Sequence, residues 1–217
     1  MIWVLDLDET LFNEQDFVLS GLRQTAQVIS NECRYSSIEL FQVMKEEFLQ
    51  NGRFRIFQEL LILYPDIHFS LENLIQIYRR TKPEINLYDD ARRLLDRISS
   101  NKIYLVTDGD RQVQSNKIDA LGIAHLFTKM FITDQHGPGA GKPGIKCFEM
   151  IKDDAKCAWN EMVYVADDPN KDFVNLKPLG MRTVRVNRGR FKNIFLEASY
   201  EAEFMVENLD EIKIEKF

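Results

Sequence analysis

Two aspartates separated by one residue stand near the start of the chain, directly after a short apolar run. The run reads Ile-Trp-Val-Leu, and Asp6 and Asp8 follow it. Such a run predicts a buried strand, and residues two apart in an extended chain point to the same side. Two carboxylates held this close repel unless a cation or a proton separates them. Because open α/β sheets bind ligands at the carboxyl ends of their strands, the pair predicts a metal-assisted site.

A hydroxyl group and a tight turn follow a second apolar run. Thr107 closes the sequence Lys-Ile-Tyr-Leu-Val and is followed by Asp108 and Gly109. The threonine hydroxyl, together with the backbone N–H groups of the next two residues, is suited to hold phosphoryl oxygens. A turn of this composition is also common without a ligand, so the signal is weak when taken alone.

A lysine and a group of aspartates complete the residues that could do chemistry. Lys142 lies between a glycine and a proline. A fixed cation beside carboxylates would steady a nucleophile and an incoming phosphate, whereas the alternative is a solvated loop lysine. Asp167 ends another apolar run and is the better metal ligand, while Asp168, which precedes a proline, is a good helix N-cap. Asp172 would lie in the first turn of that helix and would support the metal ligands without binding the metal itself.

These residues require strands that end at a common edge, and the sequence predicts such strands. They are expected at residues 2–5, 102–106, 129–132, 162–165, 182–186 and, as an edge strand, 204–206. Helical patterns lie between them, at residues 89–98, 115–121, 144–151 and 173–179. Strands that alternate with helices indicate an α/β fold, a Rossmann-like parallel sheet with helices on both faces.

Residues 15–84 have a different character, because four helical patterns follow one another without a strand. A polar turn is predicted at residues 13–16, and Ser36 opens a capping-box sequence before the second pattern. We therefore predict a small all-helical domain at residues 15–84. It is inserted into an α/β domain that comprises residues 1–14 and 85–217.

The overall composition is that of an ordinary globular protein. The chain has 217 residues, a net charge of −6, 45% hydrophobic residues and 29% charged residues. The negative charge does not suit a nucleic-acid partner, and no apolar run approaches the roughly 18 residues needed to span a membrane. Cys33, Cys147 and Cys157 lack the spacing of zinc sites, so we interpret them as reduced thiols of a cytoplasmic protein.

The order and spacing of the motifs resemble those of the haloacid dehalogenase-like (HAD) hydrolase superfamily. The family pattern opens with Asp-x-Asp-x-Thr on the first strand, which the sequence Asp-Leu-Asp-Glu-Thr matches. Thr107 matches the second motif and Lys142 the third. The fourth motif is an acidic pair after a later strand, and Asp167 with Asp172 has the spacing of its common form. The helices inserted between the first two motifs look like the family's helical cap.

Two positions depart from the family pattern. Asp108 stands where asparagine is more common, and Ala166 stands where glycine usually precedes the acidic residue of the fourth motif. Neither change removes a required group. The adjacent Asp168 leaves open which acidic residue assists Asp167 at the metal.

The resemblance implies phosphoryl transfer through a covalent intermediate. Asp6 would be the nucleophile that forms an aspartyl-phosphate, and Asp8 would be the general acid and base. Lys142 would supply positive charge, and Thr107 would donate a hydrogen bond to a phosphoryl oxygen. The implied cofactor is Mg²⁺, and its candidate ligands are Asp6, Asp8 through its backbone carbonyl, Asp167, Asp168 and Asp172.

The inserted helices are expected to choose the substrate. Arg53 and Arg55 would meet an anionic group of the substrate, or lie in solvent as an exposed pair. Arg111 would face the leaving group, and His136 is interpreted as a solvated loop residue. By likeness to similarly capped members, small phosphorylated metabolites are favoured over protein phosphates, with sugar phosphates and nucleoside monophosphates as leading candidates.

Asp8 also discriminates between activities within the superfamily. A halide needs no proton in order to leave, so a second catalytic aspartate favours a phosphatase or a phosphomutase over a dehalogenase. The main hypothesis is a Mg²⁺-dependent phosphatase acting as a monomer or homodimer, with no nucleic-acid or membrane partner. A phosphomutase on a sugar phosphate and a non-catalytic relative that binds a phosphorylated ligand are the alternatives.

Overall fold

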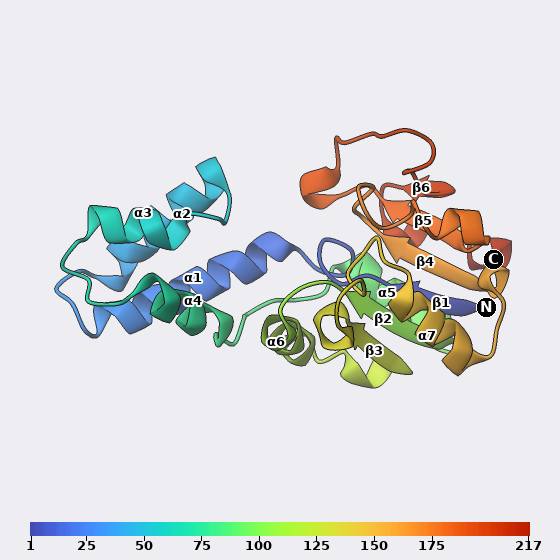
Figure 1. The fold of residues 1–217 in the computed structure, drawn as a ribbon, viewed down its shortest axis with the longest axis horizontal. Helices are drawn as coiled ribbons and strands as arrows, with labels where there is room; N and C mark the ends of the chain where they lie inside the picture. Colours follow the sequence, from blue (N-terminus) through green and yellow to red (C-terminus); the bar gives the residue numbers. More distant parts are fainter. The chain divides into compact units, whose positions relative to one another are not determined.

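The computed structural model describes residues 1–217 and divides into two compact units. One unit contains residues 1–14 and 86–217, and the other contains residues 15–85. The first consists of a sheet with helices and the second of helices alone (Figure 1). We call them the α/β unit and the helical unit.

The α/β unit is built on one sheet of six parallel strands, which confirms the predicted fold class. The strands lie in the order β3-β2-β1-β4-β5-β6. Their bounds are β1 (Ile2–Leu5), β2 (Lys102–Thr107), β3 (Lys129–Ile132), β4 (Met162–Ala166), β5 (Arg182–Val186) and β6 (Phe204–Val206). All positions of β4 are buried, as expected for a parallel strand with both faces covered.

The strand register brings the chemically active residues to one edge of the sheet. Leu5 of β1 pairs with Leu105 of β2 and with Val165 of β4. Because all three strands run in the same direction, Thr107 and Asp167 lie one residue beyond the level of Asp6.

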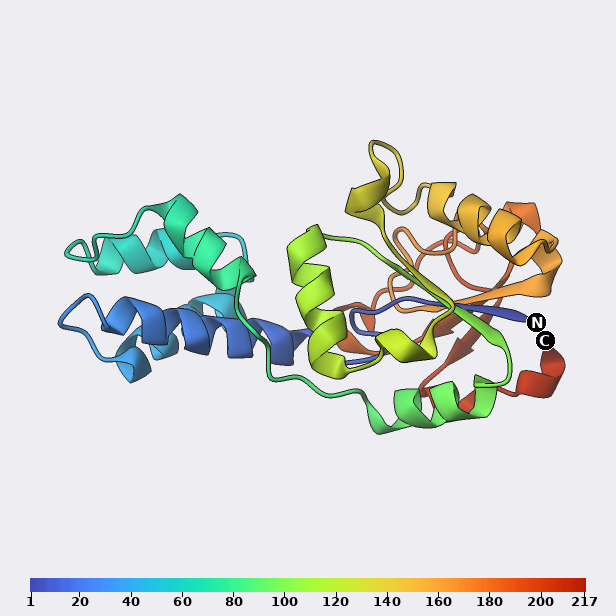
Figure 2. The same cartoon turned by 90° about the horizontal axis from the view of Figure 1, so that it is seen from below.

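Helices cover both faces of the sheet. In Figure 2, α5 (Asp89–Ile98) and α7 (Lys146–Ala155) lie on opposite sides of it, and α6 (Arg111–Leu121) lies toward the end where the strands finish. Helix α6 begins four residues earlier than predicted, because the Asp110 carboxylate accepts hydrogen bonds from the backbone N–H groups of Gln112 and Val113. This capping sets which side chains of α6 face the strand ends.

The helix predicted at residues 173–179 does not form. This segment contains successive turns and one short 3-10 helix, η4 (Lys177–Leu179). Pro178 lacks the N–H that a regular helix would need there, and Gly180 closes the segment with φ +87°. The apolar residues that produced the helical pattern are nonetheless buried, with Phe173 fully inside.

Other short 3-10 helices lie between the main elements of the α/β unit or follow its last strand. They are η1 (Ala124–Leu126), η2 (Thr133–His136), η3 (Trp159–Glu161), η5 (Gly189–Phe191), η6 (Leu209–Glu211) and η7 (Ile214–Lys216).

The two chain segments that join the α/β unit to residues 15–85 are paired with each other inside the α/β unit. Phe12 and Leu87 form an antiparallel bridge. The backbone N–H of Tyr88 donates to the carbonyl oxygen of Leu11 at 2.9 Å. The chain therefore leaves and re-enters this unit at adjacent points.

The helical unit contains α1 (Glu14–Ser30), α2 (Ser37–Asn51), α3 (Ile56–Leu63) and α4 (Leu71–Arg79), the first of which begins at the unit boundary. The polar turn predicted at residues 13–16 is wrong, since α1 begins at Glu14, where an acidic residue suits a helix N-terminus. Ser36 caps α2 as predicted, accepting from the Glu39 N–H. No helix of the protein has the length and apolar character needed to cross a membrane.

Candidate active site

The carboxyl ends of the strands bring three buried carboxylates together. Oxygen atoms of Asp6, Asp167 and Asp172 all lie within 4.8 Å of one another. The first two follow β1 and β4 directly, and the third follows the turn after β4. Three negative charges at this distance repel each other strongly unless positive charge or protons compensate them.

Lys142 supplies part of this compensation. Its Nζ atom lies 2.7 Å from Asp6 Oδ1, 2.9 Å from Asp172 Oδ1 and 2.9 Å from the hydroxyl oxygen of Tyr164. Burial alone would lower the pKa of Lys142, but Asp172 and Asp6 raise it well above its ordinary value. The ammonium group therefore stays charged inside the protein.

Asp6 and Asp167 have raised pKa values, chiefly because both carboxyl groups are buried. Burial raises the pKa of Asp6 to about 7, although Lys142 acts in the opposite direction. Burial, followed by the charges of Asp6 and Asp172, raises the pKa of Asp167 well above its ordinary range. Additional positive charge at this point would favour the ionised form of both groups.

The aspartates of the fourth motif differ in how fully their oxygens are bonded. Both oxygens of Asp172 accept hydrogen bonds, Oδ2 from the backbone N–H of Asp168 at 3.0 Å. Asp168 Oδ1 accepts from the backbone and side chain of Asn170 at 3.0 and 2.8 Å, so it caps the turn after β4. Asp167 Oδ2, by contrast, is buried and has no hydrogen-bond partner.

This arrangement fits a hard divalent cation. Carboxylate oxygens are the ligands that Mg²⁺ prefers, and the unpartnered Oδ2 of Asp167 is a buried acceptor whose desolvation nothing in the protein offsets. Asp6 and Asp167 are the side chains best placed to ligate such an ion. Asp172 already holds Lys142 in place, and the carboxylate of Asp168 serves the turn.

Asp8 points away from this group and toward α6. Its Oδ1 lies 2.6 Å from Nζ of Lys117, and its Oδ2 lies 3.0 Å from Nε2 of Gln114. The two carboxylates of the first motif therefore have separate partners, Lys142 for Asp6 and Lys117 for Asp8. Asp8 retains a side-chain exposure of 20%, whereas that of Asp6 is 6%.

In the turn after β2, Thr107 has an unpartnered hydroxyl group, whereas Asp108 bonds neighbouring segments of the chain. The Thr107 hydroxyl is buried and has no hydrogen-bond partner. Asp108 is fully engaged by the protein: its Oδ1 accepts from the Thr133 hydroxyl at 2.9 Å and from the backbone N–H of Lys142 at 3.1 Å. Gly109 has φ +128°, a conformation that side chains rarely adopt.

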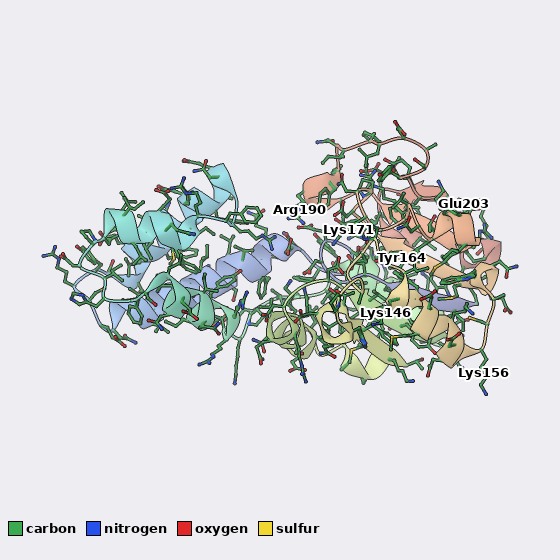
Figure 3. All side chains as sticks on the ribbon, in the orientation of Figure 1. Lys146, Lys156, Tyr164, Lys171, Arg190 and Glu203 are labelled. Atoms are coloured by element: carbon green, nitrogen blue, oxygen red, sulfur yellow. The ribbon has the colours of Figure 1, made fainter.

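Lys171 is a second cation near the strand ends that the sequence analysis did not single out. Its Nζ lies 2.8 Å from Asp108 Oδ2, and Figure 3 shows it on the side of the α/β unit where the strands finish. Although burial would raise the pKa of Asp108, Lys142 and Lys171 lower it below its ordinary value. Asp108, which stands where asparagine is common in the superfamily, is therefore neutralised in part by Lys171, the residue directly before Asp172.

The remaining predicted site residues are outside these contacts. Arg111 begins α6, and its side chain is exposed. Arg53 and Arg55 lie in the helical unit before α3, both exposed, and Arg55 forms an ion pair with Glu59 at 2.6 Å. His136 is part of η2, where its ring centroid lies 5.5 Å from that of Phe131.

Gln114 and Lys117 are the other site residues that the sequence analysis missed. They are three residues apart on α6, a spacing that places two side chains on the same helix face. Both residues follow Thr107 closely, and Asp110 is a helix-capping residue type. These two features together would predict a helix that begins at residue 111 and carries both side chains on one face. That signal was lost because the predicted helix began at residue 115.

Comparisons with known proteins identify the family of the chain. The family model of haloacid dehalogenase-like hydrolases matches residues 3–186. The glyceraldehyde 3-phosphate phosphatase of Methanocaldococcus jannaschii is 24% identical, over 96% of this chain and 93% of its own length. The phosphoserine phosphatase of Thermus thermophilus is 30% identical, over 63% of this chain and 55% of its own length.

Solved structures share the fold. The HAD-hydrolase YfnB of Bacillus subtilis, bound to magnesium, has a TM-score of 0.69 at 17% identity, covering 97% of this chain and 95% of that one. A HAD phosphatase from Thermococcus onnurineus has a TM-score of 0.60 at 22% identity, covering 97% and 94%. The family match, together with the parallel sheet, defines a hydrolase with a Rossmann-like α/β core. The chain belongs to the haloacid dehalogenase-like hydrolase family.

Proposed function

We propose that the protein is a phosphatase that hydrolyses a small phosphate monoester. The observation that carries this proposal is that, at the strand ends, a lysine holds one aspartate while a hydroxyl group and a carboxylate oxygen stay unpartnered. Asp6 is held by Lys142 at 2.7 Å, while the buried Thr107 hydroxyl and Asp167 Oδ2 have no partner in the protein. A phosphoryl group beside Asp6 would accept a hydrogen bond from Thr107, and a cation would satisfy Asp167.

In the proposed first step, a carboxylate oxygen of Asp6 attacks phosphorus. The bond between phosphorus and the leaving oxygen breaks, its electron pair goes to that oxygen, and Asp8 donates a proton to it. The products are an alcohol and an aspartyl-phosphate. Lys142 and Thr107 stabilise charge on the phosphoryl oxygens.

In the proposed second step, water attacks phosphorus of the aspartyl-phosphate while Asp8 takes up one of its protons. The bond between phosphorus and the Asp6 oxygen breaks, which releases inorganic phosphate and restores the carboxylate. Asp8 returns to its protonated form, so the cycle needs no other reactant.

We also propose Mg²⁺ as the cofactor, held by Asp6 and Asp167 and, as predicted from the sequence, by the backbone carbonyl of Asp8. When bound, it would supply the positive charge that lets a carboxylate approach a phosphate dianion. Asp172 would contribute by fixing Lys142, and the side chain of Asp168 by shaping the turn.

The size of the substrate is inferred from the relatives. Two phosphatases similar to this chain are named for glyceraldehyde 3-phosphate and phosphoserine, which are both three-carbon phosphate monoesters. We propose a substrate of comparable size, selected by a helical cap formed by residues 15–85. Arg53, Arg55 and Arg111 are the proposed contacts for its non-reacting part.

The test is a panel of phosphate monoesters incubated with the protein and Mg²⁺, with released phosphate measured. Turnover that is abolished by a chelator and restored by Mg²⁺ is expected for at least one small substrate and for p-nitrophenyl phosphate. Asp6→Asn should abolish it, while Asp153→Asn is the matched control, because that carboxylate is 78% exposed. Full activity of Asp6→Asn would contradict the nucleophile, and no phosphate release across the panel would contradict the function.

A further inference from the structure

Asp8 is held by two side chains that the proposed chemistry does not otherwise use. Lys117 contacts its Oδ1 at 2.6 Å, and Gln114 contacts its Oδ2 at 3.0 Å. Each carboxylate oxygen thus has its own donor, so the plane of the carboxyl group is fixed as well as its position. Lys117 is almost completely buried, whereas Asp8 is partly exposed.

The chain that follows β2 is arranged so that Gln114 and Lys117 reach Asp8. The Asp110 cap starts α6 early enough for residues 114 and 117 to share one face. Gln114 Nε2 also donates to the backbone carbonyl of Asp108 at 2.6 Å. A Cβ at Gly109 would lie only 2.7 Å from that same Nε2. The amide therefore passes directly under the turn that follows Thr107.

The surroundings of Lys117 are poorly explained by stability alone. Its ammonium group lies over the ring of Phe12, 5.8 Å from the centroid, and 3.8 Å from Glu14 Oε1. Removing a lysine ammonium from water is costly, and the attraction within a buried ion pair often does no more than offset that cost. A pair of this kind is weak evidence for stability, so a role in orienting Asp8 accounts better for its presence.

We propose that Lys117 and Gln114 are positioning residues for proton transfer by Asp8. Together they hold its carboxyl group in one orientation for two proton transfers. The protonated form donates to the leaving oxygen, and the ionised form, which the Lys117 ammonium group favours, takes a proton from water. Both residues would act through the Asp8 carboxyl group, which they contact directly. This inference rests on the proposed phosphatase function and specifies which groups control its acid.

A comparison of leaving groups isolates this role. p-Nitrophenolate is stable as an anion and leaves without a proton, whereas the alkoxide of glycerol phosphate must be protonated. The quantity to measure is kcat/KM, because it reports the steps up to departure of the leaving group and not hydrolysis of the aspartyl-phosphate. Glycerol phosphate and p-nitrophenyl phosphate are therefore compared for each variant.

Lys117→Met should lower kcat/KM for glycerol phosphate by about 10- to 100-fold, since misplacement of a catalytic group by about 1 Å can cost 10²-fold. The value for p-nitrophenyl phosphate should change by less than about 3-fold, because general acid catalysis contributes little to that substrate. Gln114→Leu should show the same selective loss with a smaller magnitude. Asp8→Asn gives the full effect of losing the acid, and adding Lys117→Met to it should produce no further selective loss.

The control is Gln112→Ala, which alters an exposed side chain of the same helix and should leave both substrates unaffected. Equal losses for both substrates in Lys117→Met and Gln114→Leu would overturn the inference, as would a further selective loss in the double variant. If Lys117→Met does not fold, Gln114→Leu decides the question alone. Absence of phosphate release by the unmodified protein would instead overturn the proposed function, and the inference with it.

Discussion

The ammonium group of Lys142 lies between Asp6 and Asp172 and is 1% exposed. It contacts two of the three carboxylates that lie together there, those of Asp6, Asp167 and Asp172. At the level of single residues, the charge balance of the strand ends therefore depends on Lys142, and to a lesser degree on Lys171, which pairs with Asp108.

Lys142→Met should destabilise the metal-free protein by about 3 to 5 kcal/mol, the range for breaking a buried ion pair by removing one partner. The loss arises because Asp6 and Asp172 remain buried without their cation. Urea denaturation measures it. Lys156→Met is the matched control, since Lys156 is exposed and lies at the opposite end of the α/β unit (Figure 3). Equal stability of the two variants would contradict this account of Lys142.

The raised pKa of Asp6 makes cation binding depend on pH. The pKa is about 7 in the folded protein, against an ordinary value of 3.8, so between these values the folded state holds a proton that the unfolded chain has lost. The stability of the metal-free protein therefore falls as pH rises through about 7. Cation binding requires the ionised carboxylate, so Mg²⁺ should raise the Tm more at pH 8 than at pH 6.

Thermal unfolding with and without Mg²⁺ at both pH values tests this expectation. Asp153→Asn should behave like the unmodified protein, because its carboxylate is exposed. An equal rise in Tm at pH 6 and pH 8 would show that no group titrating near neutrality takes part in binding.

At the scale of elements, the loop between η2 and α7 fixes where Lys142 lies. Gly144 packs against this loop so closely that an added Cβ would overlap the carbonyl oxygen of Gly139 and lie 2.8 Å from that of Gly141. These neighbours are backbone atoms, which cannot rotate away as a flexible side chain could. The loop is also tied to the β2 turn, because the backbone N–H of Lys142 donates to Asp108.

Gly144→Ala should therefore displace Lys142 and reduce kcat by about 10- to 100-fold, with a loss of about 1 to 3 kcal/mol in stability. Gly137→Ala is the matched control in the same loop. Nothing lies within 4 Å of an added Cβ, although φ is +80°, so backbone strain of about 1 to 3 kcal/mol is expected without a change in kcat. Similar kcat values for both variants would argue against the role given to Gly144.

Arg185 organises another connection, the segment from residue 189 to residue 201. This arginine of β5 is fully buried. It contacts both oxygens of Glu201 at 3.0 and 2.8 Å and the carbonyl oxygens of Phe191 and Ile194 at 2.8 Å each. One buried side chain therefore bonds this segment at three places.

Arg185→Met should accelerate amide hydrogen exchange in residues 189–201, because the bonds that order this segment are lost. Hydrogen-exchange mass spectrometry measures the effect. Arg182→Met provides the control, since Arg182 on the same strand bonds Glu203 at 2.7 Å and not this segment. Unchanged exchange in residues 189–201 would refute the assignment.

Elements dominated by local signals could be predicted from the sequence. Strand β5 and helix α5 have the predicted bounds, because apolar periodicity and flanking turn residues both mark them. The helix predicted at residues 173–179 failed because buried turns and a helix share the same apolar pattern. The contact of Asp8 with Lys117 was missed because the predicted helix began at residue 115, and not at the Asp110 cap that places Gln114 and Lys117 on one helix face.

At the scale of the whole molecule, the proposed catalytic residues and two of the proposed substrate contacts belong to different units. Asp6, Asp8, Thr107, Lys142 and Asp167 all belong to the α/β unit. Arg53 and Arg55 belong to the helical unit. If residues 15–85 select the substrate, substitutions there should change the relative rates of different substrates, whereas substitutions at the strand ends should slow all of them.

Joint replacement of Arg53 and Arg55 by alanine should raise KM about 10-fold for a phosphate monoester with a second anionic group, such as phosphoserine. The reason is the loss of a charge-assisted hydrogen bond worth about 1.5 kcal/mol or more. The KM for p-nitrophenyl phosphate should not change. Arg34→Ala is the control in the same unit, because Arg34 is 73% exposed and pairs with Asp66. A uniform change for both substrates would contradict the selective role.

The bridge between Phe12 and Leu87 has a consequence for how such a protein can diversify. Because the chain leaves and re-enters the α/β unit at adjacent, mutually paired points, residues 15–85 form one contiguous cassette. Recombination could exchange this cassette for another of different length without shifting the register of any strand. New substrate preferences would then arise in a single genetic event, while the inherited chemistry at the strand ends is preserved.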